Sequence, residues 1–498
     1  MINKHMQPII ILGIDGLDPC LVKKFVETGI MPRLRKYVKR CFFAKMLSTI
    51  PPLTIPAWAS LFTGLDQSQL QAYDMFRVNK HFNIKFLTND IWRGEYLWDI
   101  LSLYGIKMGV LFFPFLYNPY PINGFMITDP VLGKIKTYPP NLHLHLSCLT
   151  EFTVLHNILP PLMIHSSKKN LRCKMKLLNE LEHKSDGWQV LFLQDGLSDI
   201  SMHQGNLKDI IEAYSLIDEL IGNAFEICES NNWYLLIVSD HGLQRAKRVF
   251  SIGTYFVVKG LTKLREISPL TKLSLVLYQF LLSELAKVDH KLSRILINLI
   301  KHLKFKSSRG SKKSTIQFYD ISSTIIPYFS VGSNFANLWI GKILSHDRFL
   351  HDLSNLPIME KIRGKAYCHN DGAKDGMYLT PLTLEFREDI QPEYLPLPKI
   401  MFRTNGFMHR KYATFIAYGP SIKGGLKFDY SISIIDFLPT LLAMLHVPIP
   451  DDRHGHIITE MFKSQDVIKI QYIPKPRISV IMKLKGLKKA LSHRRDIQ

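Results

Sequence analysis

Acidic and histidine side chains directly follow three short apolar runs in this chain. The runs and the residues after them are Pro8–Ile14 with Asp15, Trp188–Gln194 with Asp195, and Trp233–Ser239 with Asp240 and His241. Apolar runs that do not alternate with polar residues are typical of strands buried on both faces. In open sheets of parallel strands, ligands bind beyond the carboxyl ends of the strands. We therefore expect these side chains to converge on one place.

The types and spacing of these residues indicate a metal site. Asp240 and His241 offer an oxygen and an imidazole ligand from a single turn, which suits zinc or manganese. Asp195 and Asp199 are spaced i, i+4, so one helical turn would place both carboxylates on the same side. An aspartate after a strand is often only a helix cap, and a lone histidine such as His409 is often structural. The prediction therefore depends on the whole set, which supplies about as many ligands as two metals need.

Thr54 is the candidate nucleophile. It precedes Pro56 in the segment Pro51–Trp58, and proline is favoured in the first turn of a helix. Thr54 would then lie at a helix N-terminus, where the helix dipole and free N–H groups favour an alkoxide and a bound phosphoryl group. The plainer interpretation of Thr54 is an N-cap residue.

The elements between these residues indicate an α/β fold. Met108–Phe113 and Ala413–Tyr418 are two further strand-like runs, and Asp209–Ser230 has apolar residues at helical spacing. Strands that alternate with helices predict a central, mostly parallel sheet sandwiched by helices.

The composition excludes some classes of protein. The chain of 498 residues has no uninterrupted apolar segment long enough to cross a membrane, and its N-terminal run is too short for a secretory signal. We therefore expect a cytoplasmic protein. The six cysteines form no CxxC pair, so neither a zinc ribbon nor a disulfide scaffold is indicated. The formal net charge of +21 implies an anionic partner, which could be a phosphorylated substrate, an anionic lipid surface or nucleic acid.

Two basic segments stand apart from the predicted catalytic domain, which comprises residues 1–260 and 314–462. Residues 261–313 form a Leu/Ile-rich helical pattern with interspersed Lys and Arg, which predicts a helical insert. Residues 463–498 form a basic tail. Each is either a solvated surface or a peripheral contact with anionic membrane.

The motifs together resemble the alkaline phosphatase superfamily, and within it the type I phosphodiesterase/nucleotide pyrophosphatase family. The motifs are Gly13-Ile14-Asp15-Gly16, Thr54-Ile55-Pro56-Ala57-Trp58 with Phe62-Thr63-Gly64, Val238-Ser239-Asp240-His241-Gly242, and His409 with Ala417-Tyr418-Gly419-Pro420. Ile435–Thr440 and Pro450-Asp451-Asp452 are similar to the family's C-terminal signature. The resemblance extends through most of the chain and is weakest in the insert and the tail.

The resemblance implies the roles of individual residues. Asp15, Thr54, Asp240 and His241 would hold one divalent metal, and Asp195, Asp199 and His409 the other. Zinc is the metal that the family implies. The family usually has Asp-x-x-x-His where this chain has Asp195-Gly-Leu-Ser-Asp199. A second aspartate makes the site harder and more anionic, which shifts the balance towards manganese or magnesium. His203, one helical turn further on, is an alternative ligand.

The resemblance implies a metal-dependent hydrolase of phosphoric esters that acts through a phospho-threonine intermediate on Thr54. The expected substrate is a small-molecule or lipid-linked phosphate ester. Phe115, Tyr117 and Tyr120 could stack on an aromatic leaving group, although such residues more commonly belong to the core.

Four other functions stay open. A phosphotransferase or mutase would use the same fold, as would a sulfatase, although the chain has no Cys/Ser-x-Pro-x-Arg signature. A degenerate, non-catalytic member is the third alternative, because Asp199 departs from the family's pattern. A nucleic-acid binder is suggested by charge alone, and no sequence signature of specific nucleic-acid binding supports it.

Overall fold

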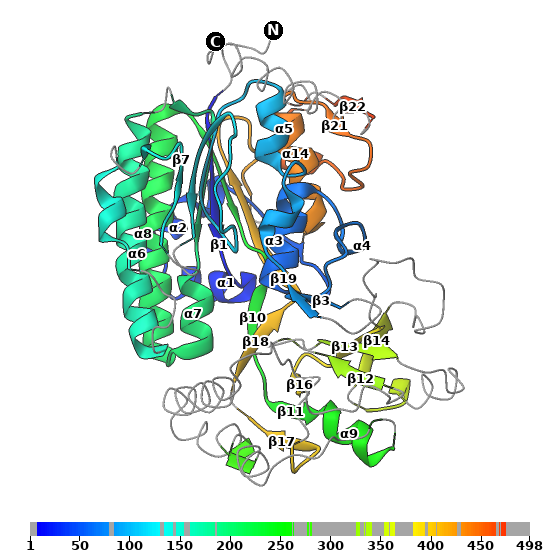
Figure 1. The fold of residues 1–498 in the computed structure, drawn as a ribbon. Helices are drawn as coiled ribbons and strands as arrows, with labels where there is room; N and C mark the ends of the chain where they lie inside the picture. Colours follow the sequence, from blue (N-terminus) through cyan, green and yellow to red (C-terminus); the bar gives the residue numbers. More distant parts are fainter. Residues whose placement is uncertain are drawn as a thin grey trace.

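In the computed structural model, a nine-stranded sheet forms the centre of the molecule (Figure 1). The structure describes residues 7–260 except 79–83, 130–133, 143–145, 154–159 and 185–186, then short segments between 262 and 400, and residues 401–474 except 405, 426–429, 465–467 and 469. In spatial order, the strands are β20 (Ser431–Ser433), β2 (Phe42–Leu47), β19 (Tyr412–Tyr418), β9 (Tyr234–Val238), β1 (Ile9–Ile14), β8 (Val190–Asp195), β5 (Met108–Phe113), β6 (Gly124–Thr128) and β7 (Thr137–Tyr138).

The inner strands run parallel, which brings the predicted site residues to one edge of the sheet. β1 lies between β8 and β9 and pairs in parallel with both, and β8 pairs in parallel with β5. β19 is antiparallel to both of its neighbours, β9 and β2. The sheet is therefore mixed but mostly parallel, and the predicted α/β class is confirmed.

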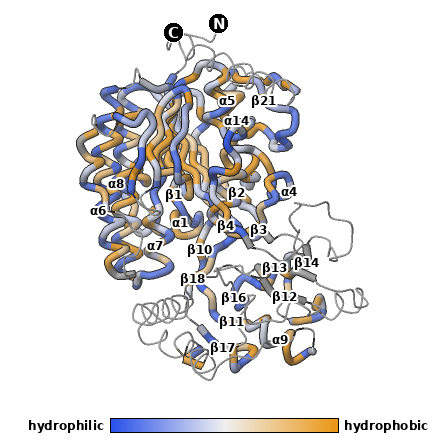
Figure 2. The backbone as a smooth tube through the Cα atoms, in the orientation of Figure 1, coloured by the Kyte–Doolittle hydropathy of each residue, from blue (hydrophilic) through white to orange (hydrophobic). Residues whose placement is uncertain are grey.

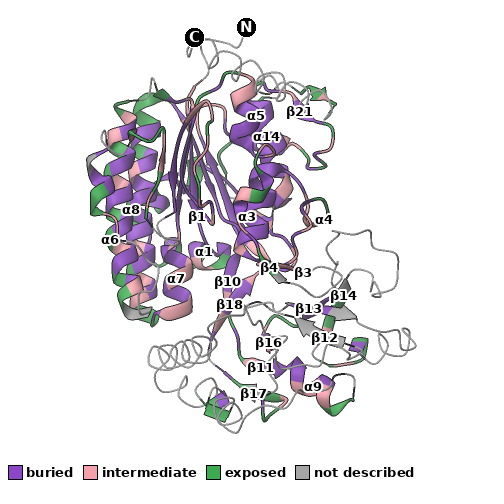
Figure 3. Ribbon diagram, in the orientation of Figure 1, coloured by how far each residue is buried: buried purple, intermediate pink, exposed green. Residues whose placement is uncertain are grey.

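Helices cover both faces of this sheet (Figure 1). One face carries α1 (Pro19–Glu27), α2 (Pro32–Tyr37), α6 (Pro160–Glu182), α7 (Leu197–Gln204) and α8 (Leu207–Asn231); the other carries α3 (Thr54–Thr63), α5 (Leu97–Leu103) and α14 (Phe437–Met444), with the short α4 (Gln67–Leu70) nearby. All six residues of β1 are buried, and successive side chains alternate between the two core layers. The strands are accordingly apolar along their length (Figure 2) and buried (Figure 3).

Smaller sheets lie beyond the edge of the large sheet where the site residues gather (Figure 1). They are the pair β10 (Gly242–Arg245) and β18 (Phe407–Arg410); β16 (Ile390–Glu393), β11 (Arg248–Ser251) and β17 (Met401–Arg403); and β12 (Ile325–Tyr328), β13 (Phe335–Ile340), β15 (Leu382–Phe386) and β14 (Met359–Arg363). Helix α9 (Ile252–Val258) packs near them, and the pairs β3 (Phe76–Val78) with β4 (Ile84–Phe86) and β21 (Ile449–Pro450) with β22 (Tyr472–Ile473) complete the described strands.

The structure describes only a small part of the two basic segments. Nearly all of the predicted helical insert 261–313 lies outside the described residues, as does the tail from residue 475 onwards. The first part of the predicted tail reaches the folded body, because β22 pairs in parallel with β21. Among the described residues, no helix combines the length and the apolar character needed to span a bilayer.

Candidate active site with two metal-ligand clusters

The first cluster of ligand-type side chains comes from two neighbouring strand ends. Asp15 follows β1 directly, and Asp240 and His241 follow β9 after Ser239. Because β1 and β9 pair in parallel, both ends lie at the same edge of the sheet. Gly16 adopts a φ of +68°, so the chain turns there, and its N–H donates to Asp240 Oδ1 at 3.1 Å.

Within this first cluster the ligand atoms face one another. His241 Nε2 lies 3.5 Å from Asp15 Oδ1 and 3.2 Å from Asp240 Oδ2. Neither of these two buried carboxylate oxygens has a hydrogen-bond partner among the residues that the structure describes. His241 Nδ1 lies 3.2 Å from the carbonyl oxygen of Gly242, to which a protonated Nδ1 would donate. That tautomer leaves Nε2 free to bind a metal ion.

The second cluster consists of Asp199, His203 and His409. Asp199 and His203 are one turn apart on α7, and their Oδ1 and Nε2 atoms are 3.2 Å apart. His409 comes from β18, and its Nε2 lies 2.9 Å from His203 Nε2 and 3.5 Å from Asp199 Oδ1. His409 Nδ1 is 2.9 Å from the carbonyl oxygen of Pro52, so this nitrogen is the natural place for the ring proton.

The two clusters form one site. The rings of His241 and His409 are stacked with their centroids 3.8 Å apart and an interplanar angle of 17°. His241 belongs to the first cluster and His409 to the second. The contact between their rings therefore places the two clusters next to each other.

The structure places Asp195 apart from the two clusters, unlike the predicted arrangement. Its Oδ2 forms an ion pair with Lys174 Nζ at 3.0 Å, and its Oδ1 accepts from the backbone N–H of Leu197 at 2.8 Å. Asp195 therefore belongs to neither cluster, and its position is explained by a cation from α6. The expected Asp-x-x-x-His spacing is met one helical turn later, by Asp199-Ile-Ser-Met-His203. His203, and not Asp195, thus lies together with Asp199 and His409.

Burial sets the protonation of the first cluster. Desolvation, followed by the nearby Asp240 and Asp199 carboxylates, raises the pKa of Asp15 well above its usual range. Desolvation also raises the pKa of Asp240, to about 7. The same burial lowers the pKa of His241 well below its usual value. Burial thus favours the uncharged form of all three side chains. A bound cation would reverse this for the two carboxyls, because it favours their deprotonated form.

The second cluster has the opposite electrostatics. Burial works against ionisation of Asp199, but the charges and hydrogen bonds of His203 and His409 outweigh it and lower the pKa of Asp199 well below its usual range. For His409, burial works against the charged form, while the hydrogen bond to Asp199 and that carboxylate's charge raise its pKa. The two imidazoles therefore favour the ionised form of Asp199, in contrast to the raised pKa values of the carboxyls in the first cluster.

Thr54 lies beside the first cluster. It is the first residue of α3, as the sequence predicted, and its Oγ1 is 3.4 Å from His241 Nε2. Trp58, one turn further along the same helix, donates from Nε1 to Asp15 Oδ2 at 3.3 Å. Helix α3 thus presents its N-terminus, a hydroxyl and an anchor for Asp15 to the same place.

A cavity of about 180 Å³ adjoins Thr54 and Asp15. One wall is a stripe of α6 at helical spacing, made of Met163, Ser167, Asn170 and Lys174. The sequence analysis did not single out these residues. Ser167, Asn170 and Lys174 recur at i, i+3 and i+7, which places them on one face of the helix. The sequence does not say that this face points towards the site.

The three aromatic residues predicted near the leaving group are used differently. Phe115 lines the cavity. The hydroxyl of Tyr120 instead accepts from Trp98 Nε1 at 2.6 Å and donates to Asp99 Oδ2 at 3.1 Å, which makes it part of the core around α5. The backbone N–H of Tyr117 donates to Asp90 at 3.2 Å, and Tyr117 is not among the residues that line the cavity.

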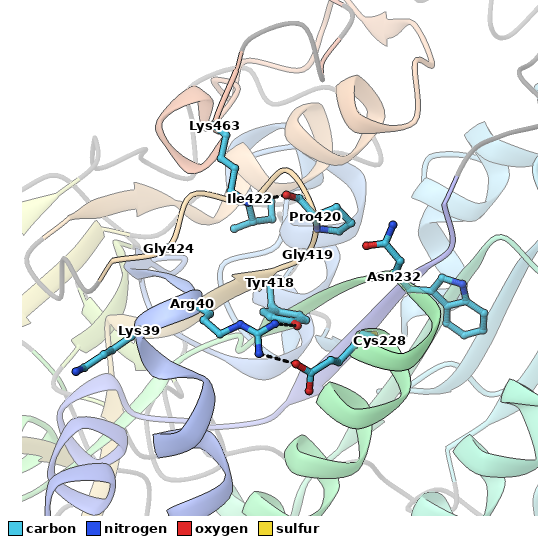
Figure 4. A pocket seen from close by; sticks show the side chains of 12 residues that line it. Lys39, Arg40, Cys228, Asn232, Tyr418, Gly419, Pro420, Ile422, Gly424 and Lys463 are labelled. Atoms are coloured by element: carbon cyan, nitrogen blue, oxygen red, sulfur yellow. Dashed lines mark hydrogen bonds and ion pairs between the residues drawn. The ribbon is translucent and has the colours of Figure 1, made fainter.

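A second cavity, of about 400 Å³, lies elsewhere on the molecule (Figure 4). Arg40 crosses it, with NH1 2.6 Å from Glu229 Oε1 and NH2 2.7 Å from the hydroxyl of Tyr418. None of the residues that line it belongs to either cluster of ligand-type side chains. Although this cavity is larger, its lining offers no counterpart of Thr54 and the two clusters, so we place the chemistry at the smaller one.

The fold agrees with the comparisons with known proteins. The structure is similar to that of phosphonoacetate hydrolase from Sinorhizobium meliloti 1021 in complex with phosphonoformate, with a TM-score of 0.54 and 11% sequence identity over 88% of this chain and 97% of that one. At this identity the likeness shows the fold alone, which is alkaline-phosphatase-like. No curated protein matches the sequence.

The sequence profile of the family described as type I phosphodiesterase / nucleotide pyrophosphatase matches residues 9–325. The chain therefore belongs to the type I phosphodiesterase/nucleotide pyrophosphatase family. This membership suggests a hydrolase of the phosphodiesterase or pyrophosphatase type.

Proposed function

We propose that this protein is a metal-dependent hydrolase of phosphoric esters that uses Thr54 as nucleophile at a two-metal site. The observation that carries the proposal is the convergence of a hydroxyl and two adjacent clusters of metal-ligand type, with Thr54 Oγ1 only 3.4 Å from His241 Nε2. Each cluster offers three ligand atoms that lie within 4.8 Å of one another. Mixed oxygen and imidazole ligands suit zinc and manganese.

The buried oxygens support a bound cation. Asp15 Oδ1 and Asp240 Oδ2 have no hydrogen-bond partner among the described residues, although buried polar atoms in folded proteins are normally satisfied. Asp15, Asp240, His241 and Thr54 would hold one ion, and Asp199, His203 and His409 the other. When bound, two divalent cations would supply the positive charge that lowers the pKa of a hydroxyl and balances the oxygens of a phosphoryl group.

The proposed reaction is a two-step displacement at phosphorus. Thr54 is placed to attack phosphorus, which forms a phospho-threonine and releases the first alcohol. Its position as the first residue of the ten-residue helix α3 exposes a bound phosphoryl group to free backbone N–H groups and to the positive end of the helix dipole. Attack by water on the phospho-threonine restores Thr54 and releases phosphate or a phosphate monoester. Net, one P–O bond of the ester is replaced by one P–O bond from water.

The proposal is tested by metal analysis followed by a panel of chromogenic phosphate monoesters and diesters, assayed with zinc, manganese or magnesium restored. Intact-mass and peptide mass spectrometry after rapid acid quenching would locate a phosphate on Thr54. We expect ester hydrolysis that chelators abolish and a phosphorylated peptide containing Thr54. Hydrolysis without any phosphorylated Thr54, together with full activity of Thr54→Ala, would contradict the nucleophile assignment.

A further inference from the structure

The stripe on α6 contains a buried hydroxyl that the fold does not use. Ser167 is 3% exposed and lines the cavity beside Thr54, and its Oγ has no hydrogen-bond partner among the described residues. Leaving such a group unsatisfied is costly, and the usual reason is a bound water or ligand. A serine hydroxyl both donates and accepts, so it fits another hydroxyl group well.

Lys174 and Asp195 place a fixed pair of opposite charges on the same cavity. Their side chains are 6% and 3% exposed, and Lys174 Nζ also lies 4.9 Å from the centroid of the Phe112 ring. An ammonium group has three N–H donors, and a carboxylate has more lone pairs than Lys174 and Leu197 use. The pair is electrically neutral as a unit, so it offers a donor and an acceptor without attracting an anion. Asp129, which also lines the cavity, adds a further carboxylate.

The cavity is small, which favours a small group. The volume of about 180 Å³ is below the roughly 300–1,000 Å³ of pockets for drug-sized ligands. Among the described residues, Phe115 is the one aromatic residue in the lining, so these residues offer a nucleobase no pair of rings between which to stack. Asn170 adds a buried amide, held by two hydrogen bonds to the backbone of Thr153 at 2.8 and 2.9 Å, which keeps this wall rigid.

We infer that this cavity binds an alcohol group of the ester and that it selects a small, polyhydroxylated group, from glycerol to a monosaccharide in size. Ser167, Lys174 and Asp195 are the specificity-determining side chains. The inference rests on the proposed function, because it concerns the ester that Thr54 would attack. It narrows the substrate class to esters of polyols, in preference to nucleotides and to phosphocholine.

Three diesters that share a p-nitrophenyl group test this selectivity: the glycerol, the ethyl and the choline p-nitrophenyl phosphates. The full-length protein with manganese or zinc restored is expected to have its highest kcat/KM on the glycerol diester. In Ser167→Ala, the ratio of kcat/KM for the glycerol diester to that for the ethyl diester should fall about threefold to tenfold, which corresponds to one hydrogen bond between neutral groups. The ratio should stay at the wild-type value in Ser166→Ala, because Ser166 is buried on the same helix but does not line the cavity.

The outcomes separate this inference from the proposed function. If the metal-loaded protein hydrolyses none of the three diesters and no phosphate monoester, the proposed function is wrong and the inference falls with it. If hydrolysis occurs but the choline or ethyl diester is preferred, or if Ser167→Ala and Ser166→Ala shift the ratio equally, the inference alone is overturned. A circular dichroism melt of each variant shows whether the variant is folded. Loss of folded protein lowers the rates on both diesters together and leaves their ratio unchanged, so a changed ratio reflects the site.

Discussion

The two ligand clusters of the site are built in different ways. The first is made by residues that directly follow two parallel neighbouring strands, and its carboxyls have raised pKa values because burial dominates. The second joins one turn of α7 to a strand of a small outer sheet, and the pKa of its carboxyl is lowered by two imidazoles. The first cluster is therefore fixed by the topology of the large sheet, whereas the second depends on how β18 is held across α7.

Thr54 lies beside the first cluster as the proposed nucleophile, so its loss should have the largest effect. Thr54→Ala is expected to lower kcat by at least about 10³-fold, since removal of a nucleophile typically has effects of this order or larger. Both metal ions should still bind, because each cluster keeps its three carboxylate or imidazole ligands. Steady-state kinetics and metal analysis measure the two quantities. Thr54→Ser is the matched control and should retain activity, and an alanine variant as active as wild type would remove Thr54 from the mechanism.

Asp199 and Asp195 provide the sharpest test of how the second cluster is composed. Asp199→Asn should reduce the metal content from two ions per chain to one, because a ligating carboxylate becomes a weak amide ligand. Asp195→Asn should keep two ions but lose about 3–5 kcal/mol of unfolding free energy, since it leaves Lys174 buried without its counter-charge.

Inductively coupled plasma mass spectrometry gives the metal content of these two variants, and urea unfolding of the metal-free proteins gives their stability. If Asp195→Asn loses a metal ion while Asp199→Asn keeps both, the assignment of the second cluster is wrong by one helical turn.

The two clusters should also differ in how pH controls metal binding. The pKa of Asp240 is raised to about 7, and the deprotonated carboxylate is the form that binds a cation. Lowering the pH from 8 to 6 should therefore weaken binding at the first cluster by about tenfold through Asp240 alone. The carboxylate of Asp199 should not contribute in this range, because its pKa is well below the usual value.

Isothermal titration with the Asp199→Asn variant isolates the first cluster for this measurement. Affinity that is flat between pH 6 and pH 8 would show that burial does not hold protons on these carboxyls.

The smallest expected effect comes from Trp58, which donates a long hydrogen bond of 3.3 Å to Asp15 Oδ2. Trp58→Phe removes this donor and should weaken metal binding at the first cluster by about threefold to tenfold. Binding at the second cluster should be unaffected, because Trp58 contacts none of its ligands directly. Titration of the Trp58→Phe variant in an Asp199→Asn background measures the effect at the first cluster. Titration of the single Trp58→Phe variant covers both clusters, and an equal loss at both would point to a general loss of structure.

The first cluster could be predicted from the sequence because its determinants are local. An apolar run, a following aspartate and the Asp240-His241 pair suffice once parallel pairing is assumed, and the start of α3 at Thr54 follows from the prolines. The second cluster could not, because Asp195, Asp199 and His203 follow one another at intervals of one helical turn and all have ligand-type side chains. What separates them is the contact between Asp195 and Lys174, 21 residues earlier on another helix, and no spacing along the chain encodes it.

Anomalous diffraction from crystals grown with zinc or manganese tests the two-cluster site most directly. We expect two strong peaks per chain, one among Asp15, Asp240, His241 and Thr54 and the other among Asp199, His203 and His409. A single peak, or a peak coordinated by the carboxylate of Asp195 with Lys174 displaced, would contradict this expectation.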